Sequence, residues 1–224
     1  MISTIPAALE LQSVSCIFGQ GARRVIALND VSLAVEPGEL IAVMGPSGSG
    51  KSTLLNVGGL LQRPTSGRVL IDGVDVSHLS PARAARARRT KVGVVFQNYN
   101  LIPTLTVGEN VGLPLELDGV QPRGAVEIAL EEVGLGGMSD RFPDEISGGQ
   151  AQRVAIARAL IGPRSVLLAD EPTGALDTNS GEGVLRILRE RIDAGAAGIL
   201  VTHEPRFAAW ADRTVLVRDG VIQK

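Results

Sequence analysis

The sequence predicts an α/β fold with a mostly parallel sheet, and three observations carry this prediction. Four short runs are almost wholly apolar, which is typical of strands buried on both faces of a sheet. Each run is followed directly by glycine or polar residues, as expected where parallel strands bring binding groups to one edge. A stretch rich in helix signals separates the second run from the third. The runs are Leu40–Met44, Val92–Phe96, Val166–Ala169 and Ile199–Thr202.

Two further strands are expected before the first apolar run. Leu9–Phe18 and Val31–Val35 alternate partially between apolar and polar residues, which indicates strands with one buried face. A turn at residues 36–39, which contains Pro37 and Gly38, separates the second of them from the first apolar run.

Residues 98–163, approximately, are expected to form a helical lobe inserted into the α/β core. Thr106 and Glu109 have the spacing of a capping box, which predicts a helix start. Further helices are expected over Pro122–Gly134 and Gln150–Leu160, and Pro163 prevents the last from continuing. The 224 residues then form a single domain whose core comprises about residues 1–97 and 164–224.

Composition and charge limit the classes of partner and compartment. The net charge of −2 gives no electrostatic reason to expect binding to nucleic acid or anionic lipid. A basic cluster over residues 83–91 is interpreted as a solvated helix face, the alternative being a nucleic-acid or lipid patch. The single cysteine, Cys16, has no partner for a disulfide or a metal site, which favours the cytosol. No targeting segment is visible and no apolar run approaches the roughly 18 residues that span a bilayer, so any membrane role is expected to come from a partner.

A glycine-rich loop follows the first apolar run and matches the pattern G-x-x-x-x-G-K-[ST]. Its glycines let successive backbone N–H groups turn inward to hold phosphate, and the following helix adds its positive end. Lys51 is expected to contact the outer phosphates and Ser52 to offer its hydroxyl to Mg²⁺. A surface turn that matches by chance is the alternative, but the strand–loop–helix context favours a nucleotide site. The loop comprises Gly45, Pro46, Ser47, Gly48, Ser49, Gly50, Lys51, Ser52 and Thr53.

Two adjacent acids, Asp170 and Glu171, follow the third apolar run. An aspartate at a strand tip can hold Mg²⁺, and a neighbouring glutamate can orient or partly deprotonate an attacking water. The alternative is an acidic turn, which Pro172 also favours. The phosphate loop upstream favours the functional interpretation of both carboxylates.

A second anion-binding turn opens the helix over Gln150–Leu160. Ser147 can cap this helix, and the glycines after it leave the helix N-terminus bare for a phosphate. An ordinary Ser-Gly cap is the alternative. Two phosphate-binding turns on one chain are explained if two chains enclose the nucleotide and each supplies one turn. The second turn comprises Ser147, Gly148, Gly149 and Gln150.

With these motifs the sequence resembles the ABC (ATP-binding cassette) ATPases over essentially its whole length. Gly45–Thr53 is similar to their Walker A motif, Val166–Glu171 to Walker B with its catalytic glutamate, and Ile146–Gln150 to the signature motif. The remaining matches are Gln97 to the Q-loop glutamine, Gly174–Asp177 to the D-loop and His203 to the switch histidine. The resemblance implies a P-loop NTPase (RecA-like) core with a mostly parallel sheet, an N-terminal antiparallel β subdomain and an inserted α-helical subdomain.

One subgroup is more similar still, namely the ATPases of macrolide export, lipoprotein release and bacitracin-type peptide resistance. The similarity lies in Phe96–Pro103, Asn110-Val111 and Asp170–Asp177. Phe18 stands where the family has an adenine-stacking tyrosine, so its ring is expected to stack on the base, the alternative being a core aromatic. Ile146 stands where leucine is usual, which preserves an apolar contact.

The resemblance also implies a mechanism. Two cassettes pair head to tail, with ATP between the phosphate loop of one and the Ser147 turn of the other. Asp177 of the D-loop also belongs to the nucleotide site. Glu171 orients the water, and His203 contacts the γ-phosphate. Gln97 contacts Mg²⁺ together with Ser52 and Asp170, and it links the metal to the helical lobe. The segment 98–106 receives a short helix of a membrane permease, for which its apolar residues Leu101–Pro103 are suited, the alternative being that these residues pack in the core. The permease contact places the chain at the cytoplasmic face of the membrane, with no nucleic-acid partner.

Two alternatives stay open. A soluble ABC ATPase acting on DNA or ribosomes is disfavoured, because such relatives carry long coiled coils, zinc modules or two cassettes in one chain. Mechanotransmission to a membrane partner without transport uses the same cassette, and the sequence does not distinguish it from export.

Overall fold

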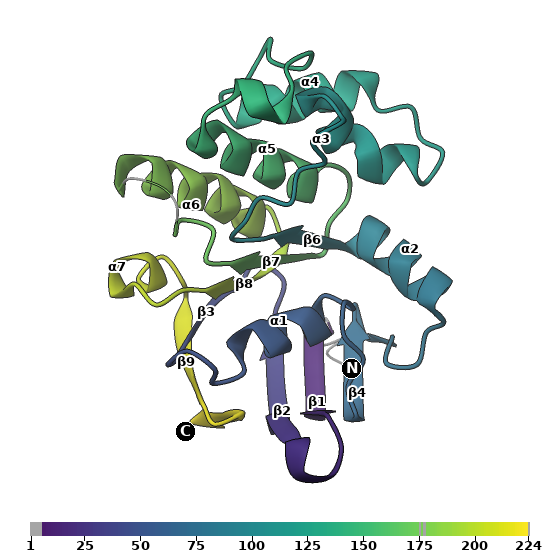
Figure 1. Cartoon of the computed structure of the whole chain (residues 1–224), viewed down its shortest axis with the longest axis vertical. Coiled ribbons are helices and arrows are strands. Elements are labelled where there is room, and N and C mark those ends of the chain that lie inside the picture. The colour runs from purple at the N-terminus through teal and green to yellow at the C-terminus, as the bar shows by residue number, and fades with distance from the viewer. Residues whose placement is uncertain (1–5, 175, 177, 224) are drawn as a thin grey trace, which may run out of the picture.

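A computed structural model describes residues 6–174, 176 and 178–223 of the chain (Figure 1). Its larger sheet has six strands in the order β10-β9-β3-β8-β7-β6. The neighbours from β9 to β6 pair in parallel, and only β10 pairs with β9 in antiparallel orientation. These strands are β3 (Leu40–Met44), β6 (Val92–Val95), β7 (Val166–Asp170), β8 (Ala197–Val201), β9 (Arg213–Arg218) and β10 (Val221–Gln223). The mostly parallel sheet predicted from the four apolar runs is therefore confirmed.

A second sheet of four antiparallel strands has the order β2-β1-β4-β5. It confirms the antiparallel β subdomain that the family resemblance implied. Its strands are β1 (Leu9–Phe18), β2 (Val25–Val35), β4 (Ser66–Ile71) and β5 (Val74–Asp75). The sequence located only the last five residues of β2, because Val25 and Ile26 are exposed at its start and give no alternation of buried and exposed residues.

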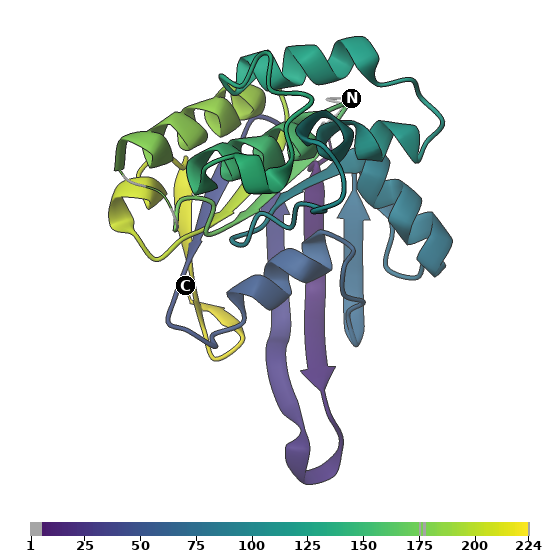
Figure 2. The same ribbon diagram turned by 45° about the horizontal axis from the view of Figure 1, so that its top comes forward.

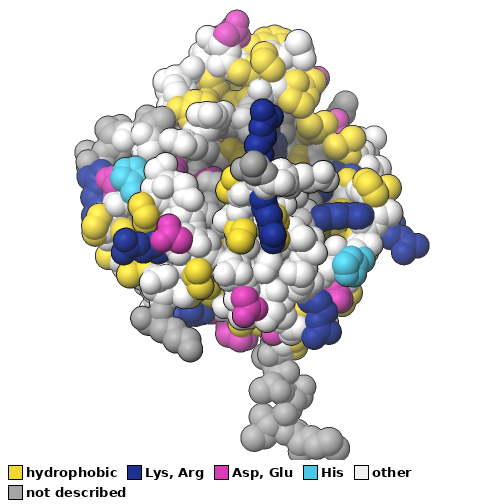
Figure 3. Space-filling view, turned by 60° about the horizontal axis from the view of Figure 1, so that its bottom comes forward, with side chains coloured by type: hydrophobic (Ala, Val, Ile, Leu, Met, Phe, Trp, Pro, Cys, Tyr) yellow, Lys and Arg dark blue, Asp and Glu magenta, His cyan; other side chains and the backbone are white. Residues whose placement is uncertain are grey.

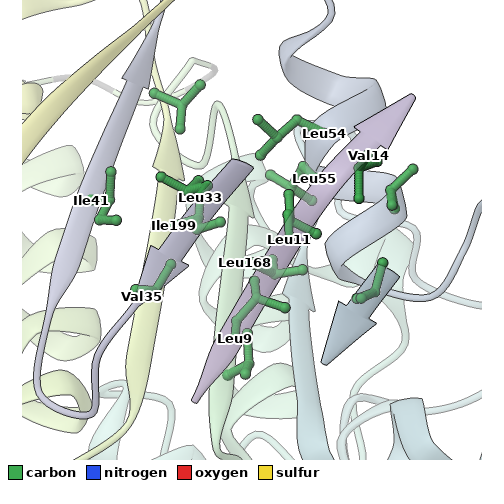
Figure 4. Close-up of a cluster of buried hydrophobic side chains, with 14 of the residues drawn as sticks. Leu9, Leu11, Val14, Leu33, Val35, Ile41, Leu54, Leu55, Leu168 and Ile199 are labelled. Atoms are coloured by element: carbon green, nitrogen blue, oxygen red, sulfur yellow. The ribbon is translucent and has the colours of Figure 1, made fainter. Parts of the chain in front are cut away.

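Helix α1 (Lys51–Gly58) packs between the two sheets. Its side chains Leu54 and Leu55 are buried among residues of both sheets, including Leu11 of β1 and Ile199 of β8 (Figure 4). A second apolar cluster lies on the other face of the parallel sheet and joins it to the helical lobe. The parallel sheet is thus covered on both faces, as its uniformly apolar strands require.

The helical lobe contains α3 (Val107–Glu116), α4 (Arg123–Glu132) and α5 (Gly148–Leu160). In Figures 1 and 2 these helices gather at one end of the molecule, and the strands β1 and β2 extend from the other. The predicted capping box is present, because Glu109 N donates to Thr106 Oγ1 and Thr106 N donates to Glu109. The remaining helices are α2 (Pro81–Lys91), α6 (Thr178–Asp193), α7 (Pro205–Ala208) and the 3₁₀ turns Gly21–Arg23 and Pro143–Glu145.

The basic cluster lies on α2, a helix with no fully buried residue. Arg89 forms an ion pair with Asp118, and Lys91 forms one with Asp72. Basic and acidic side chains are also interspersed on the face of the molecule in Figure 3. These contacts agree with a solvated helix face, as the sequence indicated.

Candidate functional site

The phosphate loop connects β3 to α1, and its backbone requires glycine at two positions. Gly45 has a φ of 153° and Gly50 a φ of 108°, and residues other than glycine rarely adopt either value. A Cβ at Gly45 would overlap the carbonyl oxygen of Val217, and one at Gly50 would overlap that of Ala27. The loop can therefore lie close against β9 and β2 only because these two residues have no side chain.

Lys51 points back into this loop from the first turn of α1. Its ammonium donates to the carbonyl oxygens of Gly45 and Pro46, each at 2.8 Å. An ammonium has three donors, so one remains for a phosphate oxygen while the other two hold the side chain inside the loop. The predicted role of Lys51 as a phosphate contact fits this position.

A cavity of about 440 Å³ opens over the loop. From the other strand ends it receives Gln97 after β6, Asp170 and Glu171 at the end of β7, and His203 after β8. The edge of the parallel sheet thus assembles the groups that the sequence placed beyond its apolar runs. From the loop and α1 the cavity is lined by Gly45, Ser47, Gly48, Gly50, Lys51, Ser52 and Thr53.

Asp170 is a half-buried carboxylate at the end of β7. Burial raises its pKa, and the negative charge of Glu171 acts in the same direction, whereas a hydrogen bond with Ser52 and the charge of Lys51 oppose the rise. Oxygen donors of Asp170, Ser52 and Gln97 line one cavity, which suits Mg²⁺, a cation that is usually held by one or two protein oxygens together with substrate phosphates. Within the described ranges there is no group of three or more His, Cys, Asp or Glu that would hold a metal alone.

Glu171 has an unusual backbone and a defined partner. Its φ of 49° lies in the left-handed region, and its N–H donates to the carbonyl oxygen of Val201 on the neighbouring strand. Both carboxylate oxygens lie 2.9 Å from Nδ1 of His203. This hydrogen bond raises the pKa of the His203 imidazole, with the charge of Glu171 as the second cause. The two predicted catalytic residues therefore contact each other at the cavity mouth.

The segment after Gln97 contains two successive left-handed residues, Tyr99 with a φ of 55° and Asn100 with a φ of 50°. The guanidinium of Arg158 on α5 donates to both of their carbonyl oxygens, at 2.7 Å each. The side chain of Gln97 in turn lies beside Gly174, in the turn that follows Glu171. The sequence analysis missed Arg158, because nothing in its local pattern distinguishes it from any other helical arginine.

The turn at Ser147 forms the N-terminus of α5 as predicted. Ser147 Oγ accepts from the backbone N–H of Gln150, and the Gln150 side chain accepts from the N–H of Ser147. Ser147 and Gly148 are exposed, and no residue of this turn lines the cavity over the phosphate loop. The two turns that the sequence predicts to bind phosphate therefore do not share a cavity within the described chain.

Two predicted nucleotide contacts have a different outcome. Phe18 is 41% exposed at the end of β1 and pairs with Val25, but it does not line the cavity, so its stacking on a base stays a prediction. Val25 and Ile26 do line the cavity and are apolar and exposed, which the sequence analysis missed. Asp177 lies outside the described residues.

Comparison with known proteins places the chain in a family. Residues 28–174 match the family model described as ABC transporter. Over 96% of its length the chain is 47% identical to the macrolide export ATP-binding/permease protein MacB of Salmonella typhimurium and 43% identical to that of Neisseria gonorrhoeae. It spans about a third, 34%, of the length of these relatives. The cassette MJ0796, solved as a dimer in a post-hydrolysis state with ADP and Pi, superimposes with a TM-score of 0.90 at 38% identity, covering 96% of this chain and 97% of that one.

Proposed function

This chain belongs to the ABC transporter family and is an ATP-binding, ATP-hydrolysing cassette, and from that premise we propose that it powers export or release of a substrate through a membrane permease. The observation that carries the proposal is the single cavity in which the phosphate loop, Asp170, Glu171 and His203 meet. In domain terms, we assign about residues 1–97 and 164–224 to the catalytic core and about 98–163 to the helical lobe.

The phosphate loop and Lys51 hold the triphosphate of ATP in this proposal. Ser52, Asp170 and Gln97 hold Mg²⁺, whose charge, when it is bound, offsets the charge of the transferring phosphoryl group. The two ammonium hydrogen bonds to Gly45 and Pro46 keep the Lys51 charge at the loop, so little rearrangement is needed when negative charge develops.

Glu171 orients the attacking water. The water oxygen forms a bond to the γ-phosphorus, the bond from that phosphorus to the bridging oxygen of ADP breaks, and the water proton passes to the Glu171 carboxylate. His203, which already hydrogen-bonds this carboxylate, holds it at the cavity mouth and contacts the γ-phosphate.

A second copy of the chain completes the site with its Ser147 turn. Three observations support this: Ser147 and Gly148 are exposed, the turn does not line the chain's own cavity, and the similar cassette MJ0796 is a dimer. ATP closes the pair and ADP does not, because only ATP offers a γ-phosphate to the turn. A shift of closure from 1:99 to 99:1 requires about 5.5 kcal/mol. Two or three hydrogen bonds to a charged group, at about 1.5–3 kcal/mol each, supply it.

The membrane partner binds the helical lobe near residues 98–106. None of the helices in the described part of the chain is long and apolar enough to cross a membrane. The similar MacB proteins are named as combined ATP-binding and permease proteins, and this chain corresponds to about a third of them. We therefore place the cassette at the cytoplasmic face of the membrane, with the partly exposed Ile102 in the contact with a permease.

The substitution Glu171→Gln tests the function. It keeps the size and most hydrogen bonds of the side chain but removes the charge that accepts the water proton. We expect ATP binding within twofold of the wild type, hydrolysis reduced at least about a hundredfold, and a stable ATP-bound dimer in size-exclusion chromatography. Hydrolysis at the wild-type rate would reject the proposed role of Glu171.

A further inference from the structure

Gln152 is a buried polar residue of α5 that the proposed mechanism does not use. Its side chain is 1% exposed, and its Nε2 donates to the carbonyl oxygen of Pro172 at 2.7 Å. Its Oε1 is also buried and accepts no hydrogen bond from any residue that the structure describes. Gln152 is therefore directed by a single contact, and that contact is with the residue next to Glu171.

The turn that carries Glu171 is held at several points. Glu171 N donates to Val201 of β8, and Gly174 N donates back to the carbonyl oxygen of Glu171. These bonds fix the start and the width of the turn. The hydrogen bond to Pro172 comes instead from the helical lobe, through Gln152, and it holds the Pro172–Thr173 peptide, the second peptide after the left-handed Glu171.

Packing alone does not explain a glutamine at this position. A buried polar atom without a partner destabilises a protein. An apolar side chain of similar length would remove the unpaired Oε1 but would also leave the Pro172 carbonyl oxygen without its donor, so the glutamine brings no clear gain in stability. Residues that weaken stability but orient a strained backbone are typical of functional sites. The neighbouring strained residue here is Glu171, so the contact is best explained by the orientation of this carboxylate.

Gln152 also connects the two half-sites of the proposed dimer. It lies five residues after Ser147 on the same helix, which places the two about 7.5 Å apart along the axis. Ser147 would contact the ATP held by the other chain, whereas Glu171 would act on the ATP held by its own chain. A rigid helix with both contacts links occupancy of one site to the geometry of the other.

We propose that Gln152 is a positioning residue for Glu171, through which α5 couples the Ser147 turn at one ATP site to water activation at the other. This inference rests on the proposed function, since it assumes that Glu171 orients the water. It predicts that Gln152 affects the chemical step and hardly affects ATP binding.

The test compares Gln152→Met, which keeps the chain length without a donor, with the control Ile156→Val on the same helix. Ile156 is fully buried and has no polar atom to offer the turn. For Gln152→Met we expect kcat to fall ten- to a hundredfold, KM for ATP to stay within twofold, and Tm to change by less than about 4 °C. Ile156→Val should keep kcat within twofold. Gln152→Asn, whose side chain is one methylene shorter, should also lower kcat. This variant replaces Gln152→Met in the test if the methionine variant does not fold.

A double variant with Glu171→Gln separates this inference from the function on which it rests. If Gln152 acts through Glu171, the double variant hydrolyses ATP no more slowly than Glu171→Gln alone, and it still forms the ATP-bound dimer. Wild-type kcat in both Gln152 variants, or a further tenfold loss in the double variant, would overturn the positioning role. Wild-type hydrolysis in Glu171→Gln alone would instead reject the proposed function.

Discussion

Arg158 offers a quantitative test of how the helical lobe holds the segment after Gln97. Its guanidinium makes two 2.7 Å hydrogen bonds to the carbonyl oxygens of Tyr99 and Asn100, the two left-handed residues of that segment. Burial lowers the pKa of Arg158, which indicates that its charge has lost much of its hydration. The substitution Arg158→Met keeps an unbranched apolar stem and removes both donors.

The size of the effect follows from these contacts. Two hydrogen bonds from a charged donor contribute about 1.5–3 kcal/mol each, or roughly 3–6 kcal/mol together. Two effects offset about half of this sum. The variant no longer loses the hydration of a guanidinium on folding, and water can hydrate the partly exposed carbonyl oxygens that the arginine has left. We therefore expect the free energy of unfolding to fall by about 1.5–3 kcal/mol, which corresponds to a Tm lower by about 3–12 °C for a chain of this size.

The functional consequence lies in the Mg²⁺ dependence. Left-handed residues other than glycine cost about 1–3 kcal/mol each when nothing holds them, so the released segment relaxes and Gln97 loses its position. If restoring it on metal binding costs about 1 kcal/mol, the Mg²⁺ concentration for half-maximal ATPase activity rises about fivefold.

Steady-state ATPase assays across a Mg²⁺ titration, together with thermal denaturation, measure both effects. Arg158→Lys is the matched control, because one ammonium keeps the charge but does not bridge two carbonyl oxygens as a guanidinium does. It should lie between the wild type and Arg158→Met. A methionine variant with unchanged Tm and unchanged Mg²⁺ dependence would refute the reasoning.

Two further predictions concern the dimer and the stability of the core. Ser147→Arg places a bulky cation in the second phosphate-binding turn, so turnover should fall at least about a hundredfold while one chain still binds ATP in a fluorescence titration; normal turnover would contradict the two-chain site. Hydrogen bonding to Arg189, and to the backbone of Leu40, holds the pKa of Asp212 below its ordinary 3.8, so this carboxylate stabilises the fold above that pH and the stabilisation is lost as the pH falls towards the folded pKa. Asp212→Asn should lower the free energy of unfolding by at most about 1 kcal/mol at pH 7, because about half of the Asp212 side chain is exposed to solvent, and the difference from the wild type should vanish in acid. A difference that persists in acid would show that the charge is not its cause.

The phosphate loop and the strand ends could be predicted from the sequence because their signals are local. A buried strand, a glycine pattern and a helix start follow one another within residues 40–58, and each determines its own geometry. The acids after β7 and the histidine after β8 needed one more step, which is that parallel strands end at a common edge. Topology supplies this rule without any knowledge of side-chain contacts.

The contacts of α5 could not be predicted in the same way. Gln152 reaches a residue 20 positions away, and Arg158 reaches residues 58 and 59 positions away. Both lie in a helix whose pattern indicates only that one face is buried. The exposed start of β2, with Val25 and Ile26 at the cavity, was missed for the opposite reason, since apolar residues without a buried partner give no periodic signal.

Helix α5 therefore organises the site as much as the parallel sheet does. The sheet fixes where each catalytic residue leaves its strand, but Gln152 holds the turn after Glu171 and Arg158 holds the segment after Gln97. The N-terminus of the same helix carries the Ser147 turn. A 13-residue helix is about 20 Å long and stiff, so a displacement at Ser147 would reach both contacts. The two contacts have different readouts, because loss of the Gln152 contact should lower kcat at constant KM, whereas loss of the Arg158 contact should shift the Mg²⁺ dependence. Comparing the two variants would therefore show which contact transmits engagement of the second chain to hydrolysis.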